Sequence, residues 1–190
     1  MELFEKLNAA NKLPSLIVLD LDYTIWPLWI DTHVSGPPFT ADPSRPYTVS
    51  DRRGNEIKLY EDIPAILNLV KNFPDIKMGL ASRTSEPTWA RDVVSIMPFP
   101  SNDASDESQK TTLSDFFDYS EIYPSSKVRH FKKMHKDSDI PYENMIFFDD
   151  EMRNNDVQHQ LGVQFVNVPH GLTMLGFLRG IERYADNRTD

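Results

Sequence analysis

The chain has 190 residues, of which 39% are hydrophobic and 11% aromatic, a composition that suits a soluble globular protein with one hydrophobic core. Its 29 acidic side chains outnumber the 20 lysines and arginines, and the net charge of -9 disfavours binding to nucleic acid or to an anionic membrane surface. Cysteine is absent, which excludes disulfides, cysteine-ligated zinc and a thiol nucleophile.

The first residues lack the basic start and long apolar core of a secretory signal, and no apolar run approaches the roughly 18 residues of a membrane span. We therefore expect an intracellular protein, in the cytoplasm or also in the nucleus. No linker or repeat divides the sequence, which predicts a single domain over residues 1–190 with a small insertion at about 26–60. A monomer is compatible with these features.

A short helix is expected over residues 2–12, followed by a buried strand, Leu16 to Leu19, that leads directly into Asp20 and Asp22. Residues two apart in an extended segment point to the same side, so both carboxylates should lie at the carboxyl edge of a parallel sheet, where open α/β sheets bind ligands. Neighbouring carboxylates repel each other unless a divalent cation or a shared proton neutralises them. An ordinary Asx turn at the strand end is the alternative interpretation.

The segment after this strand is rich in aromatic residues and proline. Trp26 and Trp29 are close enough to the paired acids in sequence to form the wall of a pocket, although aromatic residues at this position also serve as ordinary core. His33 and Asp31 could form a metal-binding pair, but a capping or solvent-exposed histidine is the favoured interpretation.

Two alternating arms around a glycine-containing turn predict a β-hairpin over residues 47–60. The hairpin falls between the first strand and an amphipathic helix that starts near Ile63, so we expect a small flap over the sheet edge that carries the acids. Arg52 and Arg53 at its tip are candidates for contact with an anionic substrate, and exposed unpaired arginines are equally typical of such a turn.

A second strand is predicted over residues 76–81, and it is followed at once by Ser82 and Arg83. Thr84 or Ser85 is the expected N-cap of the next helix. A helix N-terminus offers free amides that suit phosphate, although capping alone also explains these hydroxyls.

The polar stretch 98–112 predicts an exposed insertion, and residues 121–123 a short strand. Ser125 or Ser126 then caps a helix whose first turn contains Lys127. A lysine there opposes the helix dipole, a local conflict that is typical of functional residues.

A third buried strand over residues 144–148 repeats the opening pattern, because it ends in Asp149 and Asp150. At a strand exit one of these acids can bind a metal directly and the other through water or a hydrogen bond. The last expected elements are a helix over about 152–161 that stops at Gly162, a strand over 163–168 and a helix over 173–185.

The four segments that carry these polar residues are Asp20-Leu21-Asp22-Tyr23-Thr24, Ser82-Arg83-Thr84, Ser125-Ser126-Lys127 and Phe147-Phe148-Asp149-Asp150-Glu151. Together they resemble the four motifs of the haloacid dehalogenase (HAD) superfamily over roughly residues 15–170. In detail they look like its magnesium-dependent phosphatase branch, whose members have only a small cap. The resemblance implies a Rossmann-like three-layer α/β/α core with a mostly parallel sheet and a small β-hairpin flap.

The resemblance also implies a phosphatase that works through an aspartyl-phosphate, with Asp20 as the nucleophile and Asp22 as the general acid and base. Mg²⁺ would be held by Asp20, by the backbone carbonyl of Asp22, and by Asp149 or Asp150, between which the sequence does not choose. A set of oxygen ligands without a competing histidine or cysteine independently favours Mg²⁺ over zinc.

Ser82, Lys127 and the backbone amide of Arg83 would hold the phosphoryl oxygens, and Leu21 and Trp29 complete the substrate-binding residues that we expect. Phosphotyrosine in proteins and small sugar phosphates are the implied substrates. Two other functions are weighed against this one. A catalytically silent phospho-ligand module is expected to lose Asp22 or Lys127, and a dehalogenase needs neither Asp22 nor Mg²⁺.

Overall fold

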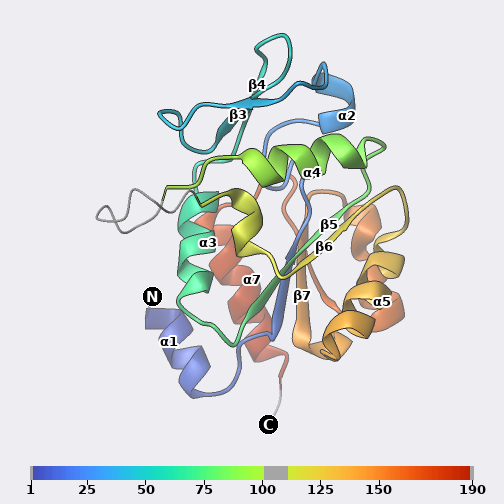
Figure 1. Cartoon of the computed structure of the whole chain (residues 1–190). Helices are drawn as coiled ribbons and strands as arrows, with labels where there is room; N and C mark the ends of the chain where they lie inside the picture. The colour runs from blue at the N-terminus through green and yellow to red at the C-terminus, as the bar shows by residue number, and fades with distance from the viewer. Residues whose placement is uncertain (1, 101–110, 189–190) are drawn as a thin grey trace.

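The computed structural model describes residues 2–100 and 111–188. Its main sheet consists of β1 (Leu16–Leu19), β5 (Lys77–Ser82), β6 (Tyr119–Ile122), β7 (Met145–Asp149) and β8 (Gln164–Asn167). The strand order is β6-β5-β1-β7-β8 and every pairing is parallel (Figure 1). All residues of the central strands β1 and β7 are buried, as expected for a parallel sheet that is covered on both faces.

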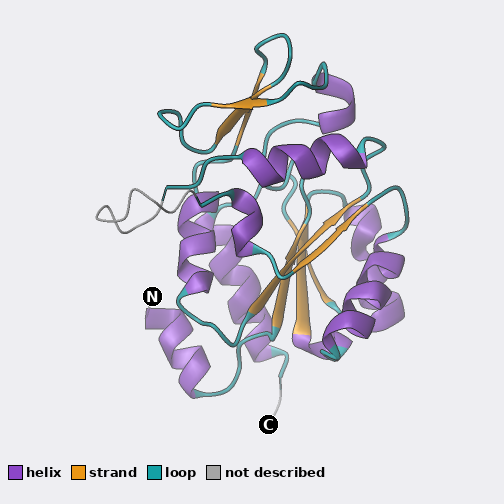
Figure 2. Ribbon diagram, viewed as in Figure 1, coloured by secondary structure: helices purple, strands orange, loops and turns teal. Residues whose placement is uncertain are grey.

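Helices cover both faces of this sheet and give the predicted three-layer α/β/α arrangement (Figure 2). Ile17 and Leu19 join one hydrophobic cluster, and Leu16 and Val18 join the other, because successive strand residues point to opposite faces. The first cluster includes residues of α1 (Glu2–Ala9), α3 (Ile63–Lys71), α4 (Pro87–Ile96) and α7 (Met174–Asp186). The second includes residues of α5 (Lys127–Ser138) and α6 (Asp156–Leu161).

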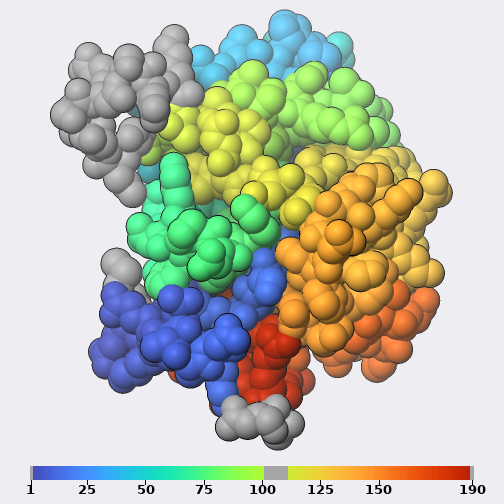
Figure 3. Space-filling view, turned by 60° about the horizontal axis from the view of Figure 1, so that its bottom comes forward, coloured from blue at the N-terminus to red at the C-terminus, as the bar shows by residue number. Residues whose placement is uncertain are grey.

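The two ends of the main sheet differ. At the amino ends of the strands, α1 and α5 lie on either side of the end of α7 (Figure 3). At the carboxyl ends lies a second, antiparallel sheet of β2 (Thr40–Ala41), β3 (Thr48–Ser50) and β4 (Glu56–Lys58), close to α2 (Ile30–His33). The predicted hairpin is thus present, and β2 adds a strand that is too short to be recognised in the sequence.

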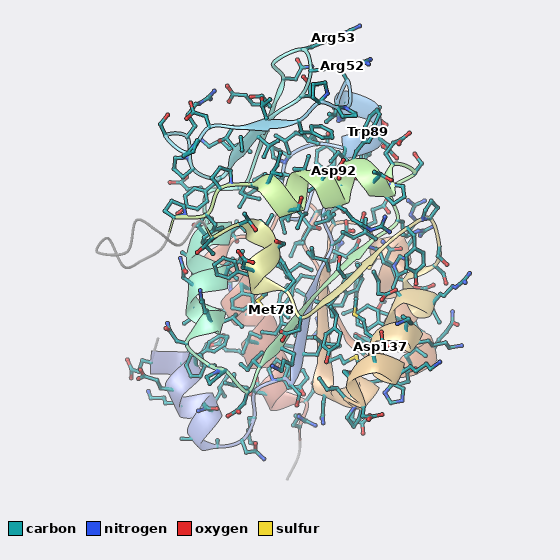
Figure 4. All side chains as sticks on the ribbon, in the orientation of Figure 1. Arg52, Arg53, Met78, Trp89, Asp92 and Asp137 are labelled. Atoms are coloured by element: carbon teal, nitrogen blue, oxygen red, sulfur yellow. The ribbon has the colours of Figure 1, made fainter. Side chains whose placement is uncertain are left out.

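The carboxylate of Asp51 fixes the turn of this hairpin. It accepts the backbone N–H groups of Ser35 (2.7 Å), Arg53 (2.8 Å) and Asn55 (2.9 Å), and also the side-chain amide of Asn55. Burial alone would raise the pKa of Asp51, but these hydrogen bonds hold it well below its usual range. The turn is therefore tied to the segment that follows α2, and Arg52 and Arg53 project from its tip (Figure 4).

The start of α4 differs from the prediction. Glu86 occupies the N-cap position and the helix begins at Pro87, so neither Thr84 nor Ser85 caps it. Both hydroxyls have other partners, since that of Thr84 accepts the N–H of Glu86 and that of Ser85 donates to Asp31. The loop between β5 and α4 is consequently longer than the sequence pattern indicated.

Other element ends agree more closely with expectation. Ser126 caps α5 by accepting the N–H of Arg129, and α6 ends at Gly162, whose φ is 87°.

Most of the predicted insertion at 98–112 lies outside the described residues. None of the described helices is long and apolar enough to cross a membrane. The predicted helix at 152–161 is divided into the 3₁₀ turn η3 (Met152–Asn155) and α6. Two further 3₁₀ turns are η1 (Leu113–Phe116) and η2 (Tyr142–Asn144).

A histidine is buried in the core beside the main sheet. The side chain of His130 on α5 is completely buried, and its Nε2 lies 3.1 Å from the carbonyl oxygen of Tyr123. Burial, together with the positive charge of Lys127, lowers the pKa of His130 to about 4. The folded protein therefore holds this imidazole in its neutral form.

Stability should fall in mild acid because of His130. In the unfolded chain the imidazole has its ordinary pKa of about 6.5, whereas in the folded chain its pKa is only about 4. Lowering the pH from about 6.5 to 4 should therefore lower the free energy of unfolding by up to about 3 kcal/mol from this group. His130→Leu should remove that part of the pH dependence in urea unfolding curves, while His170→Gln, at an exposed histidine, should keep it. Parallel pH profiles for wild type and His130→Leu would contradict the assignment.

Candidate active site

Residues from the carboxyl ends of three parallel strands meet around a pocket of about 270 Å³. The strands are β1, β5 and β7, while α2 and the first turn of α5 complete the walls. None of the residues 47–60, all of which the structure describes, lines this pocket. The predicted site residues that do line it are Asp20, Asp22, Trp29, Ser82, Arg83, Lys127 and Asp150.

Two predicted site residues lie deeper. Asp149 is completely buried beside Asp150. Leu21 is also completely buried, and its side chain belongs to the hydrophobic core. Any contact of Leu21 with a ligand would therefore have to come from its backbone.

A buried ammonium group links the ends of three strands. Lys127 Nζ lies 2.5 Å from Asp20 Oδ1 and 3.1 Å from Asp149 Oδ2, and it also donates to the backbone carbonyl of Ala81. Burial alone would lower the pKa of Lys127, but the negative charges of Asp20 and Asp149 outweigh it and raise the pKa. Lys127 is therefore charged. Its positive charge is unfavourable at the N-terminus of α5, and the two carboxylates compensate for that.

Asp20, Asp149 and Asp150 form a cluster that can hold a metal ion. Each offers a carboxylate oxygen, and these atoms all lie within 4.8 Å of one another. Burial raises the pKa of Asp20 well above its ordinary value, and burial with the charges of Asp149 and Glu151 raises that of Asp150 to about 6. One ammonium group cannot balance three carboxylates, so the cluster fits a divalent cation with a preference for oxygen ligands.

The carboxylate of Asp22 is held apart from this cluster. Its Oδ1 accepts the indole N–H of Trp26 at 2.7 Å and the backbone N–H of Ile30 at 3.2 Å. Burial raises the pKa of Asp22 to about 6, although these two hydrogen bonds act in the opposite direction. A carboxyl group with such a pKa can both donate and accept a proton near neutral pH.

The two tryptophans of the first loop have different positions. Trp26 is completely buried, whereas Trp29 is 46% exposed and lines the pocket. The Trp29 indole stacks on His33 with ring centroids 5.5 Å apart, and His33 Nδ1 accepts the backbone N–H of Trp29 at 3.0 Å. His33 thus caps α2, in agreement with the favoured interpretation, and it is not part of the acid cluster.

Comparison with known proteins identifies the family. The family model described as Acid Phosphatase matches residues 12–187. The chain is also 41% identical over 170 residues to a HAD-like hydrolase superfamily protein of Schizosaccharomyces pombe, which covers 88% of this chain and 94% of that protein. The chain belongs to the acid phosphatase family of HAD-like hydrolases. The resemblance stated from the sequence is thereby confirmed.

A second relative and two solved structures agree with this assignment. The human protein named Magnesium-dependent phosphatase 1 is 37% identical over 178 residues, covering 94% of this chain and 91% of that protein. A putative 3-deoxy-D-manno-octulosonate 8-phosphate phosphatase from Vibrio cholerae has a TM-score of 0.52 at 12% identity, covering 97% of this chain and 92% of that chain. A HAD-superfamily hydrolase from Ehrlichia chaffeensis has a TM-score of 0.57 at 10% identity, covering 90% and 98%. These two structures confirm the fold.

Sequence reasoning about the HAD motifs missed Asn154. This buried side chain donates from Nδ2 to both carboxylate oxygens of Asp149 at 2.9 Å, and its Oδ1 accepts from Arg83 Nη1 at 2.9 Å. The backbone N–H of Glu151 donates to Asp149 Oδ1 at 2.7 Å. The sequence feature that could have revealed this residue is an amide side chain about one turn after Asp149 and Asp150. Asn154 therefore orients Asp149 and connects it to the loop after β5.

Loss of Asn154 should weaken metal binding. Asn154→Ala removes two hydrogen bonds to Asp149, and loss of such a supporting contact typically lowers metal affinity about 10- to 100-fold. Isothermal titration with Mg²⁺ or Mn²⁺ would measure the change. Asn155→Ala, at the next position, is the matched control and should bind like wild type, because the side-chain amide of Asn155 contacts His159 instead of Asp149. Equal affinities for Asn154→Ala and wild type would show that Asp149 is oriented by other contacts.

Proposed function

We propose that this protein is a Mg²⁺-dependent phosphomonoesterase that forms an aspartyl-phosphate on Asp20. The observation that carries the proposal is the separation of two carboxyl groups with different environments at one strand end. Asp20 pairs with Lys127 and belongs to the acid cluster, whereas Asp22 is bonded to Trp26 and Ile30. A nucleophile must be ionised and a general acid protonated. The Lys127 ammonium and a bound cation would favour the ionised form of Asp20, whereas Asp22 lies outside the acid cluster and burial raises its pKa to about 6.

In the first half of the reaction, a carboxylate oxygen of Asp20 attacks phosphorus and the bond from phosphorus to the leaving oxygen breaks. The carboxyl group of Asp22 donates its proton to that leaving oxygen, which departs as an alcohol or phenol. Lys127 and the hydroxyl of Ser82 hold phosphoryl oxygens, together with the backbone amide of Arg83. The product of this half is an acyl phosphate on Asp20 and an ionised Asp22.

In the second half, the carboxylate of Asp22 accepts a proton from a water molecule as that water attacks the phosphorus. The bond between phosphorus and the Asp20 oxygen breaks, inorganic phosphate leaves, and Asp22 is protonated again. Both acids therefore return to their starting states. Asp22 lines the pocket, which is open to solvent, and this supports access by water.

The residues proposed to hold Mg²⁺ are Asp20, Asp149 and Asp150, together with the backbone carbonyl of Asp22. When bound, Mg²⁺ would supply the positive charge that these carboxylates and a phosphate group lack, and so favour attack by an anionic nucleophile. The acid cluster supports this assignment, and so does the name of the human relative. The hard oxygen donors suit this metal.

For substrates, we propose phosphomonoesters with a ring in the leaving group, with phosphotyrosine in proteins and sugar phosphates as the two candidate classes. The pocket is open to solvent, and half-exposed Trp29 offers a flat surface beside Asp20 and Asp22. An indole can stack on a phenyl ring or cover the apolar face of a sugar.

Asp20→Asn should abolish hydrolysis of p-nitrophenyl phosphate, because an amide cannot form the acyl phosphate. Wild type should turn over with Mg²⁺ and stop in excess EDTA. The exposed variant Asp75→Asn, near the opposite end of the sheet, should keep wild-type activity. Activity in Asp20→Asn would refute the mechanism, and an inactive wild type that still binds phosphate esters would favour the catalytically silent module.

Trp29→Ala should raise KM for p-nitrophenyl phosphate about three- to tenfold, the effect expected for loss of one aromatic contact. The rate constant kcat should change little, since Trp29 touches no reacting atom in this proposal. Trp29→Phe keeps a stacking ring and should recover most of the affinity. Steady-state kinetics would test both variants, and unchanged kinetics in Trp29→Ala would remove Trp29 from the binding site.

A further inference from the structure

The one-turn helix α2 is bonded to two different strand ends of the active site. On one side, the backbone N–H of Ile30 donates to Asp22 Oδ1 at 3.2 Å. On the other side, the carboxylate of Asp31 reaches the loop between β5 and α4. The N-cap residue of α2 is Trp29, whose indole lines the pocket. This helix therefore lies between the first motif and the loop that begins with Ser82.

Asp31 makes a contact with a residue that is distant in the sequence. Its Oδ2 accepts both the backbone N–H and the hydroxyl of Ser85, at 3.1 and 2.8 Å, across 54 positions of sequence. Partial burial alone would raise the pKa of Asp31, but these bonds and one from Thr32 lower it. Asp31 is thus a charged acceptor at neutral pH, and such charge-assisted hydrogen bonds are stronger than neutral ones.

The loop that Asp31 holds is the proposed phosphoryl-binding loop. Within it, Ser82 Oγ accepts the N–H of Thr84 and Thr84 Oγ1 accepts the N–H of Glu86, so the loop is partly self-supporting. Within residues 2–100 and 111–188, both hydrogen bonds that join α2 to this loop end on Asp31.

We propose that Asp31 is a positioning residue, which clamps the phosphoryl-binding loop to the helix that presents Trp29. The clamp fixes the distance between the group that holds the phosphate and the surface that holds the leaving group. The inference rests on the proposed function, which assigns phosphate binding to the loop and leaving-group binding to Trp29. Asp31 itself takes no part in bond making or proton transfer.

The clamp should affect binding more than chemistry. Asp20 and Lys127 hold each other, and Asp22 keeps the indole N–H of buried Trp26, so these contacts do not depend on Asp31. The helix α2 should also remain folded in Asp31→Ala. His33 still accepts the backbone N–H of Trp29, and Gly36 still packs directly against the Trp89 ring. Asp31→Ala should therefore fold and should mainly loosen the fit between the two halves of the pocket.

Kinetics of four variants with p-nitrophenyl phosphate and Mg²⁺ form the first arm of the test. Asp31→Ala should raise KM about tenfold and leave kcat within about threefold of wild type. Asp31→Asn keeps an acceptor oxygen and should rescue most of the affinity. Ser85→Ala should raise KM less, since its N–H still donates, and it should have no further effect in the Asp31→Ala background. An unchanged KM, or a kcat that falls as far as KM rises, would overturn the proposal.

Asp42→Ala is the matched control. Asp42 Oδ1 accepts the N–H and the hydroxyl of Ser44 at 2.9 and 2.7 Å, which is the same pair of bonds in an exposed loop that does not line the pocket. It should have wild-type KM and kcat. An equal rise of KM in Asp42→Ala would show that loss of any such pair disturbs the protein, and would overturn the specific role of Asp31.

Amide hydrogen exchange forms the second arm and needs no activity. In Asp31→Ala the amide of Ser85 loses its acceptor, and under the proposal the amides of Trp29 and Ile30 should also exchange faster. Faster exchange at Ser85 alone would mean that Asp31 does not hold α2, and would overturn the clamp. A wild type without phosphatase activity would refute the proposed function, whereas the exchange result would still decide whether the clamp exists.

Discussion

The ion pair of Lys127 with Asp20 and Asp149 is the interaction on which the rest of the site depends. An ammonium group that is 1% exposed is tolerated only with partners, and removing one member of a buried pair typically costs about 3–5 kcal/mol. The pair spans 107 positions between β1 and α5 and reaches β7 as well. It therefore sets where α5 begins relative to two strand ends. The fold and the site share this constraint.

This ion pair also leaves a charge imbalance that gives the site its chemistry. Three clustered carboxylates face one ammonium group in a desolvated space, which is why the pKa values of Asp20 and Asp150 are raised. A divalent cation removes the imbalance without consuming the nucleophile, whereas protonation would disable it. Asp22 does not belong to this acid cluster, because Trp26 holds its carboxylate away from the other three. Two acids at one strand end can thus have opposite roles.

The sequence predicted the acids and Ser82 as a group because buried apolar runs mark strands, and parallel strands bring their carboxyl ends to one edge. Lys127 was singled out by its position against a helix dipole, and the resemblance to the HAD motifs placed it with them. It did not predict Asn154 or the contact of Asp31 with Ser85. These side chains meet partners through the shapes of loops, over 71 positions for Arg83 with Asn154 and 54 for Asp31 with Ser85. The N-cap of α4 was misplaced for the same reason, since the hydroxyl of Ser85 is used by Asp31.

The small cap contributes to the pocket through α2 and not through its sheet. The hairpin of β3 and β4 lies outside the pocket, with its turn fixed by Asp51, whereas α2 places Trp29 and Asp31 in the wall. Among the described residues the pocket is open to solvent and does not enclose a leaving group, so selection among substrates must come from the side chains that border it. Trp29 and Asp31 border the pocket from a single helical turn, and the attachment of that turn to both strand ends decides how well they are aligned with the other walls.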